Sequence, residues 1–291
     1  MRRGGRTPPS IACDAKGIDG SGRNVTVDRE LLAGSRAHYD DPAYYAATYA
    51  NRVDDVAFYV SLARTLGGPV LEYGVGNGRI ALPVARDGAE VVGVDWSRPM
   101  LDDLRARLKL EPVPVRRRVH LVRGDIRRVR LSRRFPLVIC TFNTALHLYT
   151  RADVEHFLAR VRSHLLPRGR LVVDLSTPLP HQLARDPARP HHGPRFRHPT
   201  AAVTVKYKEH CDYDPVRQVL FVSMEFEPVS EPQDGWVTPL AHRQFFPREW
   251  EALLHYNGFD VVRVDGDFHG GPLTRESDVM VWHARPRWKR R

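Results

Sequence analysis

Between residues 69 and 175 the sequence alternates short apolar segments with amphipathic ones, and this alternation limits the possible folds more than any other feature. The apolar segments are rich in Val, Leu and Ile, as is typical of strands buried on both faces. Helical patterns lie between most of them; one is capped by Ser97 and has Leu101, Leu104 and Leu108 along one face. Repeated strand–helix units predict a parallel sheet. The predicted strands are Pro69–Tyr73, Glu90–Asp95, Val119–Val122, Leu137–Phe142 and Leu171–Leu175.

The segments on either side of this region have other patterns. Residues 1–36 are rich in Gly, Arg, Pro and Ser, which predicts a disordered tail. Apolar spacings of three and four from His38 to Leu66 predict helices, and residues 177–199 read as a loop. Beyond that loop we expect an antiparallel hairpin, a third strand, a helix and two closing strands. They are Ala202–Lys208, Gln218–Phe226, Val237–Phe246, a helix from Pro247 to Asn257, Asp260–Val264 and Asp278–His283.

Composition limits the compartment and the partners. The net charge of +11 includes a dense run of arginines from Arg116 to Arg134, which would suit a nucleic acid, although genome composition can also enrich Arg. No apolar run approaches the ~18 residues of a membrane span, so we expect no membrane partner. Cys13, Cys140 and Cys211 lack paired spacing. We therefore expect a cytoplasmic protein in a reducing compartment.

A glycine-rich segment follows the first predicted strand. Gly74, Gly76 and Gly78 stand at alternate positions, and glycine lets main-chain N–H groups approach a ligand without obstruction by a Cβ atom. Asp95 ends the next strand 21 positions after Gly74, where an acid can bind ribose hydroxyls. A dinucleotide fingerprint needs a third glycine where this chain has Arg79, so the nicotinamide interpretation is weakened.

In this register the chain resembles the class I S-adenosylmethionine-dependent methyltransferases. Their glycine motif begins with an acid, which Glu72 matches, and an acid after their third strand receives the adenine amine, which Asp125 matches. The similarity extends from about Tyr45 to Ala284. It implies a Rossmann-like, doubly wound sheet of seven strands with the last strand antiparallel, an antiparallel β insertion after the fifth strand, and an amino-terminal helical lid. The methyltransferase domain would span residues 37–291, with 177–246 as the inserted loop and β lid.

The resemblance also implies the cofactor and the residues that hold it. The cofactor would be S-adenosyl-L-methionine, with Ile126 and Met100 packed on the adenine faces and lid tyrosines near the sulfonium. Arg52 and Arg79 are the candidates for its carboxylate. The predicted cofactor-binding residues are Tyr45, Arg52, Glu72, Gly74, Gly76, Asn77, Gly78, Arg79, Asp95, Trp96, Met100, Gly124, Asp125, Ile126 and Phe142.

The acceptor is expected where the fourth strand ends, in CTFNTALHLY, because ligands gather at that edge of a doubly wound sheet. This segment resembles that of small-molecule N-methyltransferases of the glycine N-methyltransferase and amino-sugar N,N-dimethyltransferase type, whose histidine corresponds to His147. The resemblance implies that His147 orients the acceptor or takes its proton, with Tyr49 and Asn143 beside it. The predicted function is methyl transfer to nitrogen or oxygen of a small molecule.

Two other functions remain open at this stage. An RNA methyltransferase could use the Arg116–Arg134 run, although the Asn/Asp-Pro-Pro-Tyr/Phe motif of exocyclic-amine nucleic-acid methyltransferases is replaced by Thr141, Phe142 and Asn143. A non-catalytic cofactor-binding protein is the other. The histidines of the insertion form no compact ligand pattern, so we predict no metal. The sequence does not decide between a monomer and a homodimer.

Overall fold

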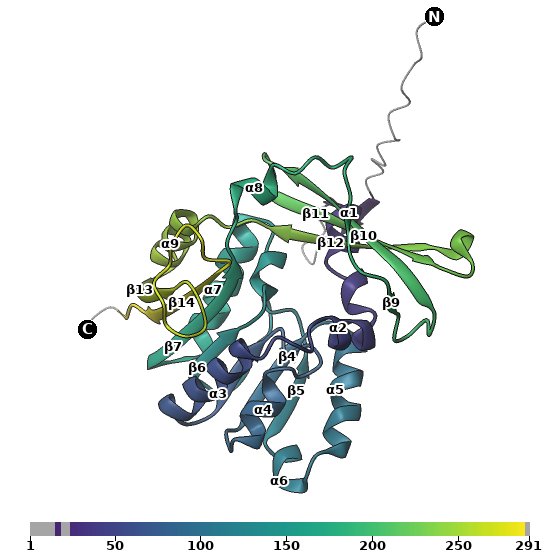
Figure 1. Cartoon of the computed structure of the whole chain (residues 1–291). Helices are drawn as coiled ribbons and strands as arrows, with labels where there is room; N and C mark the ends of the chain where they lie inside the picture. The colour runs from purple at the N-terminus through teal and green to yellow at the C-terminus, as the bar shows by residue number, and fades with distance from the viewer. Residues whose placement is uncertain (1–14, 19–23, 289–291) are drawn as a thin grey trace, which may run out of the picture.

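A seven-stranded sheet forms the centre of the computed structural model, which describes residues 15–18 and 24–288 (Figure 1). Its strand order is β13-β14-β7-β6-β3-β4-β5. The five strands from β7 to β5 are parallel, and β14 is antiparallel to both of its neighbours, as predicted. The strands are β3 (Val70–Tyr73), β4 (Val91–Asp95), β5 (Val119–Arg123), β6 (Phe135–Cys140), β7 (Leu165–Ser176), β13 (Phe259–Asp265) and β14 (Val279–Pro286).

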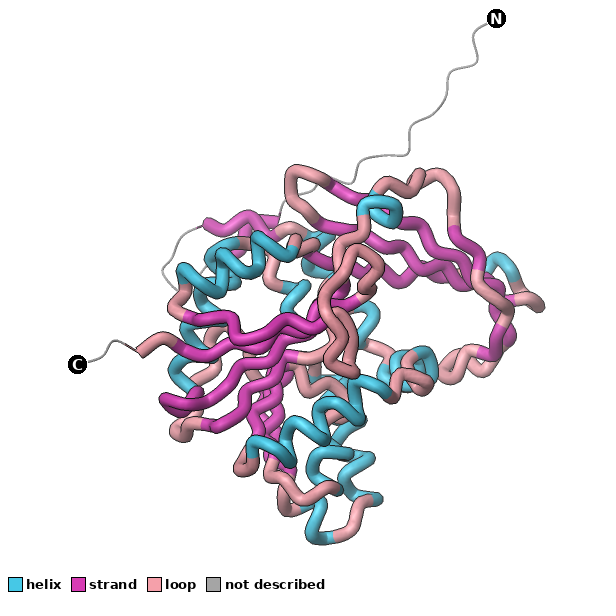
Figure 2. Tube along the Cα trace, turned by 60° about the vertical axis from the view of Figure 1, so that its left-hand side comes forward, coloured by secondary structure: helices cyan, strands magenta, loops and turns pink. Residues whose placement is uncertain are grey.

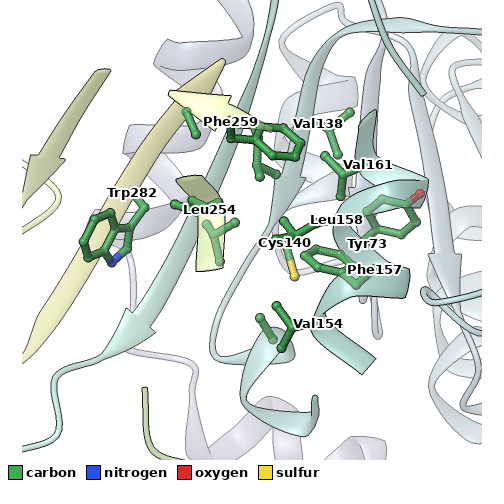
Figure 3. Packing of buried hydrophobic residues seen from close by; sticks show 14 of the residues in the cluster. Tyr73, Val138, Cys140, Val154, Phe157, Leu158, Val161, Leu254, Phe259 and Trp282 are labelled. Atoms are coloured by element: carbon green, nitrogen blue, oxygen red, sulfur yellow. The ribbon is translucent and has the colours of Figure 1, made fainter. Parts of the chain in front are cut away.

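Helices cover both faces of this sheet (Figure 2), because successive residues of its central strands point to opposite sides. Leu71 and Val138 face α7 and α9, where Phe157 and Trp250 are fully buried, and Figure 3 shows part of this packing. Val70 and the alternate residues of β6 and β7 face the other group of helices. The helices are α3 (Asp54–Leu66), α4 (Ala81–Arg86), α5 (Arg98–Leu110), α6 (Val113–Arg116), α7 (Arg151–His164) and α9 (Pro247–Tyr256).

A second, antiparallel sheet follows β7 and lies beyond the carboxyl ends of the parallel strands, at the upper right of Figure 1. It contains the predicted hairpin and third strand, and its inner face packs on Tyr44 through Val205, Met224 and Phe226. We call this sheet the lid. It comprises β8 (His191–His192), β9 (Phe196–Arg197), β10 (Thr204–Asp214), β11 (Val219–Pro228) and β12 (Trp236–Arg243), and α8 (Pro180–Leu183) and η3 (Pro232–Asp234) lie in its connections.

The amino-terminal region joins the lid to the main sheet. It contains β1 (Ala15–Ile18), β2 (Asn24–Val27), α1 (Arg29–Gly34), η1 (Ala37–Tyr39) and α2 (Pro42–Thr48). The structure differs here from the expected tail over residues 1–36: α1 is a capped helix whose Gly34 is buried against Ala241 of β12. The remaining positions of the expected tail, 1–14 and 19–23, lie outside the described residues.

Other expectations also differ from the structure: the loop expected over residues 177–199 contains α8, β8 and β9. The helical pattern from His38 to Leu66 is divided into η1, α2 and α3, with one break at Asp40 and Asp41 and another at the turn around Ala50. The strand predicted to end at Phe142 ends at Cys140, because Phe142 and Asn143 adopt positive φ angles of 49° and 65°, which a strand cannot contain. Within residues 15–18 and 24–288, no helix has the length and apolarity of a membrane span.

Candidate active site

The glycine segment forms the tight connection between β3 and α4, as predicted. Gly74 has a φ of +74°, and a Cβ atom there would lie 2.3 Å from Thr144 Oγ1, so only glycine fits. Gly76 also has a positive φ of +52°, but its surroundings are open: the nearest atom to an added Cβ would be Met100 Cε at 3.2 Å. Gly76 is therefore the position where a ligand can approach the backbone closely, above the buried Met100.

Asp95 connects this segment to the end of β4. Its Oδ2 accepts a hydrogen bond from the Gly76 N–H (2.8 Å) and its Oδ1 accepts one from the Ser97 N–H (2.8 Å). The carboxylate is thus held at the strand end, 8% exposed, with further lone pairs available on both oxygens. The next residue, Trp96, is 38% exposed, and the Arg36 guanidinium lies 4.5 Å from the centre of its ring. Asp95 and Trp96 therefore lie together beside the glycine segment, where the sequence predicted both.

Glu72 supplies a test of whether the site suits the predicted cofactor. Its Oε1 accepts a hydrogen bond from Thr141 Oγ1 (3.2 Å), whereas its Oε2 is buried and has no donor among the described residues. Burial raises the pKa of Glu72 to about 8. At neutral pH this carboxyl is therefore protonated, and a ligand that brings a charged N–H donor, as the α-ammonium of S-adenosylmethionine does, would favour its ionised form, in which Oε2 accepts.

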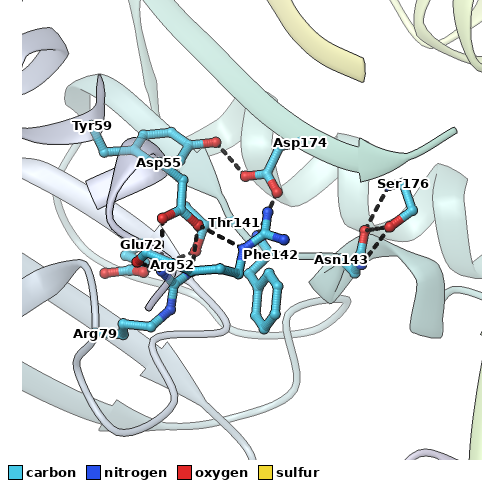
Figure 4. Close-up of polar contacts among 10 residues, drawn as sticks. All are labelled: Arg52, Asp55, Tyr59, Glu72, Arg79, Thr141, Phe142, Asn143, Asp174 and Ser176. Atoms are coloured by element: carbon cyan, nitrogen blue, oxygen red, sulfur yellow. Dashed lines mark hydrogen bonds and ion pairs between the residues drawn. The ribbon is translucent and has the colours of Figure 1, made fainter. Parts of the chain in front are cut away.

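The two candidate arginines have different surroundings (Figure 4). Arg79 donates two hydrogen bonds to the Asp55 carboxylate, at 2.8 and 2.6 Å, and its side chain is 17% exposed. Arg52 contacts Asp55 more loosely (3.5 Å) and is 42% exposed. Both guanidinium groups stack on Phe142, 4.7 Å from the ring centre. Arg52 therefore has the donors that a cofactor carboxylate could take, while those of Arg79 are used within the protein.

Aromatic residues of α2 and of its carboxyl-terminal cap meet the turn that follows β6. The ring of Tyr49 lies 4.7 Å from that of Phe142 and 4.8 Å from that of Tyr45. The Phe142 backbone N–H donates to Asp174 Oδ2 (2.8 Å), which holds the turn in place, and Asn143 exchanges hydrogen bonds with Ser176 at the end of β7. The structure thus brings together four residues that the sequence placed at the sulfonium and acceptor: Tyr45, Tyr49, Phe142 and Asn143.

The adenine side of the predicted site contains an ion pair that the sequence analysis missed. Arg127 donates to both oxygens of Asp125, at 2.7 to 3.1 Å, and also to Asp153 of α7 (2.5 Å). Its guanidinium lowers the pKa of the half-buried Asp125 carboxyl, despite the opposing effect of burial. Ile126 packs against the core, and Gly124 hydrogen-bonds to the Asp95 carbonyl (2.8 Å). The position of Arg127, two residues after Asp125, could have indicated this ion pair. Because nine arginines occur in the same stretch, the sequence did not distinguish Arg127 from the others.

His147 lies in a hydrogen-bonded chain with two tyrosines. Its Nε2 is 2.7 Å from Tyr39 Oη, and its Nδ1 is 3.1 Å from Tyr149 Oη. Tyr149 Oη in turn lies 2.9 Å from the carbonyl oxygen of Ala241 in β12. Burial lowers the pKa of His147 to about 4, so the ring is neutral at pH 7. Tyr39 was not singled out from the sequence, where it was one aromatic residue among many in a helical pattern.

A cavity of about 660 Å³ lies beside Arg52 and Asn143, and this volume falls within the 300–1,000 Å³ range of small-molecule sites; neither His147 nor Tyr39 lines it. Arg52, Asn143 and Ser176 contribute to its wall, and the loop between β13 and β14 contributes much of the rest. Acidic side chains outnumber basic ones in the lining, in contrast to the positive charge of the whole chain. The acids of the wall are Asp54, Asp55, Asp174, Asp267, Glu276 and Asp278.

Two predictions concerned metal and nucleic acid. In the part of the chain that the structure describes, no group of three or more His, Cys, Asp or Glu residues is arranged to hold a metal ion. Within the basic run, Arg127 pairs with Asp125 and Asp153, and Arg133 pairs with Glu90 (2.6 Å). Some of this positive charge is therefore already neutralised within the protein.

Comparisons with known proteins agree with this geometry. Residues 70–169 match the model of the Methyltransferase domain family. The chain is 29% identical over 252 residues to the cypemycin N-terminal methyltransferase of a Streptomyces species, covering 83% of this chain and 97% of that one. It is 31% identical over 126 residues to a dTDP-3-amino-3,6-dideoxy-alpha-D-glucopyranose N,N-dimethyltransferase of Streptomyces fradiae, over 43% and 46% of the two chains. The solved CcbJ methyltransferase of Streptomyces caelestis superimposes with a TM-score of 0.70 at 27% identity, covering 80% and 95%.

Fold, site and comparisons together define the class of protein. The chain is a methyltransferase with the class I fold, and the residues of the site fit S-adenosylmethionine as its cofactor. More narrowly, it resembles the small-molecule N-methyltransferases of the amino-sugar type. The predicted function, methyl transfer to a small-molecule acceptor, is confirmed at this level.

Proposed function

We propose that this enzyme methylates an amine nitrogen of its small-molecule acceptor. The observation that carries the proposal is the state of His147, whose two ring nitrogens are both engaged by tyrosines and whose pKa is lowered to about 4 by burial. A hydroxyl acceptor benefits from a base that removes its proton, and a histidine in this state is a poor base at pH 7. A neutral amine needs no base before attack. The N-methyltransferase relatives support the same choice.

Each cofactor residue then has a role that its contacts allow. When bound, S-adenosylmethionine supplies a methyl group on a positively charged sulfur. Asp95 accepts hydrogen bonds from the ribose, Gly76 lets the backbone approach, and Arg52 pairs with the carboxylate. Glu72, whose raised pKa would fall again beside a positive charge, accepts from the α-ammonium through its unpartnered Oε2 in the ionised form. Asp125, fixed by Arg127, accepts from the adenine amine.

The acceptor side is shaped by aromatic rings and by the lid. Tyr45, Tyr49 and Phe142 surround the position of the transferred methyl group and exclude water from it. The cavity beside Asn143 and Ser176 would receive the body of the acceptor, and its acidic wall favours a molecule with an amine. Residues 37–291 form the catalytic unit in this proposal, with 177–246 as the lid insertion.

The experiment that tests this function compares amines with matched hydroxyl compounds. The purified chain is incubated with methyl-labelled S-adenosylmethionine and a dTDP-linked 3-amino sugar, a short peptide with a free amino terminus, or the hydroxyl analogue of each. We expect the label on nitrogen of an amine compound, located by tandem mass spectrometry, and none on the analogues. Transfer to a hydroxyl analogue, or to added tRNA in preference to every amine, would contradict the proposal.

A further inference from the structure

We propose that Tyr39 is the side chain that hydrogen-bonds to the acceptor nitrogen, and that His147 is a positioning residue whose tautomer is set by Tyr149 and the lid strand β12. The inference rests on the proposed transfer to an amine. It changes the role that the sequence suggested for His147, because a histidine engaged at both ring nitrogens has no free atom for the acceptor.

The tautomer of His147 follows from the end of the hydrogen-bonded chain. The carbonyl oxygen of Ala241 can only accept, so the O–H of Tyr149 donates to it over 2.9 Å. Tyr149 then has only lone pairs to offer His147, which means that the proton is on His147 Nδ1. With one proton on a neutral ring, His147 Nε2 is an acceptor, and the Tyr39 O–H donates to it over 2.7 Å.

The hydroxyl oxygen of Tyr39 can therefore accept a hydrogen bond from the substrate, but Tyr39 has no O–H left to donate to it. Its single proton is directed to His147, and the remaining lone pair on Oη can accept an N–H from an amine. Burial, together with neighbouring Tyr45 and Tyr49, raises the pKa of Tyr39, so the phenol stays protonated at neutral pH. An O–H directed at the substrate would instead bind the amine lone pair and block its attack.

The position of Tyr39 suits this role. Its carbonyl oxygen lies 3.5 Å from Ser97 Oγ, next to the Asp95 that would hold the ribose, while its hydroxyl reaches His147 after β6. Its ring lies 5.9 Å from that of Tyr45, which is in contact with Phe142. Tyr39 thus extends from the cofactor side of the sheet edge to the acceptor side.

The chemistry that this arrangement supports is a direct displacement. The neutral amine donates one N–H to Tyr39 Oη, which turns its lone pair toward the methyl carbon. The nitrogen–carbon bond forms as the carbon–sulfur bond breaks with its electron pair going to sulfur. The resulting alkylammonium then loses a proton to water, so His147 takes up none. Its pKa of about 4 is compatible with that passive role.

The first test reads the tautomer directly and needs no acceptor. The full chain, labelled with ¹⁵N-histidine and saturated with S-adenosylmethionine, is studied by long-range ¹H–¹⁵N NMR at pH 7, with His147 assigned from the spectrum of His147→Gln. We expect a proton on Nδ1 alone in the wild type and a shift toward Nε2–H in Tyr149→Phe. Tyr256→Phe, which removes a hydroxyl from an 86% exposed tyrosine, is the control and should change nothing. A proton on Nε2, or a doubly protonated ring, in the wild type would overturn the proposal.

The second test uses whichever amine the enzyme methylates. Glutamine at 147 can place an amide oxygen near the position of Nε2, so we expect His147→Gln to retain kcat within about threefold while His147→Leu and Tyr39→Phe lose tenfold or more. Tyr149→Phe should also lower kcat, with little change in KM for S-adenosylmethionine.

If His147 were a proton acceptor, glutamine at this position would not restore activity. A loss of about 10²-fold in His147→Gln, or full activity in Tyr39→Phe, would reject the inference. If no amine is methylated, the proposed function fails, while the NMR result still decides the tautomer.

Discussion

At the scale of single residues, several groups of the site already have partners in the protein that hold them in position. Asp95 accepts from two backbone N–H groups, Asp125 is paired with Arg127, and Asn143 is paired with Ser176. Contacts of this kind reduce the conformational freedom that a side chain would lose when a ligand binds. They also mean that substitutions at the site affect both ligand binding and local order, so each prediction needs a control for folding.

The first prediction concerns the ribose contact. Asp95→Asn removes the negative charge and places an NH₂ group, which cannot accept, opposite the backbone N–H of Gly76 or Ser97. We expect the Kd for S-adenosylmethionine to rise about 10- to 100-fold, or about 1.4–2.8 kcal/mol, because the charge-assisted hydrogen bond to the ribose is lost and one backbone N–H loses its partner. Isothermal titration calorimetry measures the change. Asp102→Asn, on the half-exposed acid of α5, is the control and should leave Kd unchanged. An unaltered Kd in a folded Asp95→Asn variant would exclude Asp95 from the ribose site.

The second prediction separates two effects of replacing a glycine: blocking the approach of the cofactor to the backbone, and straining a backbone with a positive φ. In Gly76→Ala the added Cβ would meet only the flexible end of Met100, so we expect a folded protein with at least tenfold weaker cofactor binding. Gly67→Ala is the matched control, since Gly67 also has a positive φ (+63°) and no atom within 4 Å of an added Cβ. It should lower the melting temperature without changing Kd. Equal affinity in the two variants would mean that the glycine segment is only a turn.

Site residues that lie at the end of a strand could be predicted from the sequence. Site residues whose role depends on a partner far away in the chain could not. Asp95 could be found because a fully buried strand ends there. Tyr39 could not, because its partner His147 is 108 positions away and no local pattern connects them. Arg79 was predicted as a cofactor ligand on its position alone, and its pairing with Asp55 became visible only in three dimensions.

At the scale of elements, α1 fixes the amino-terminal region to the lid. It packs on β12, and Arg217 at the turn between β10 and β11 pairs with Asp28 at its start (2.7 Å). Composition predicted a tail here because the segment is rich in Gly and Arg. A glycine reads as a helix breaker in a sequence, yet Gly34 is the residue that lets α1 approach the strand.

The third prediction tests this contact with complementary substitutions. A Cβ at Gly34 would lie 2.5 Å from Ala241 Cβ, so Gly34→Ala should lower the free energy of unfolding by about 1–3 kcal/mol through overpacking. Exchanging the two residues, as Gly34→Ala with Ala241→Gly, removes one methyl group from the contact and should recover part of that loss. Urea unfolding of the two single variants and the double variant measures the coupling. Strictly additive effects would show that α1 does not rest on β12 in solution.

At the scale of the whole molecule, buried ionisable groups determine how stability depends on pH. Burial lowers the pKa of His38, His147 and His164 to about 4 each, from an ordinary value of 6.5. Burial also raises the pKa of Glu72 to about 8 and that of Asp174 to about 6. Histidines kept neutral and carboxyls kept protonated have opposite effects on stability, so the pH of greatest stability depends on which group dominates in each range.

The last prediction is that the free energy of unfolding is greatest near pH 6.5. Between pH 6.5 and 4, unfolding takes up protons on His38, His147 and His164, and also on His198, His242 and His283, whose pKa values burial lowers as well. It releases protons from Glu72, Asp174 and Asp95, whose pKa values burial raises. More histidines than carboxyls are involved, so the unfolded state binds more protons and stability falls as the pH falls. From pH 6.5 to 8, Glu72 stays protonated only in the folded state, so stability falls as the pH rises.

Urea unfolding followed by circular dichroism at pH 5, 6.5 and 8 measures these differences. His164→Gln, which removes one neutral buried histidine, should show a smaller loss between pH 6.5 and 5 than the wild type. Stability that increased steadily from pH 6.5 to 5 would mean that the carboxyls outweigh the histidines, and that the neutral state assigned to the histidines is wrong.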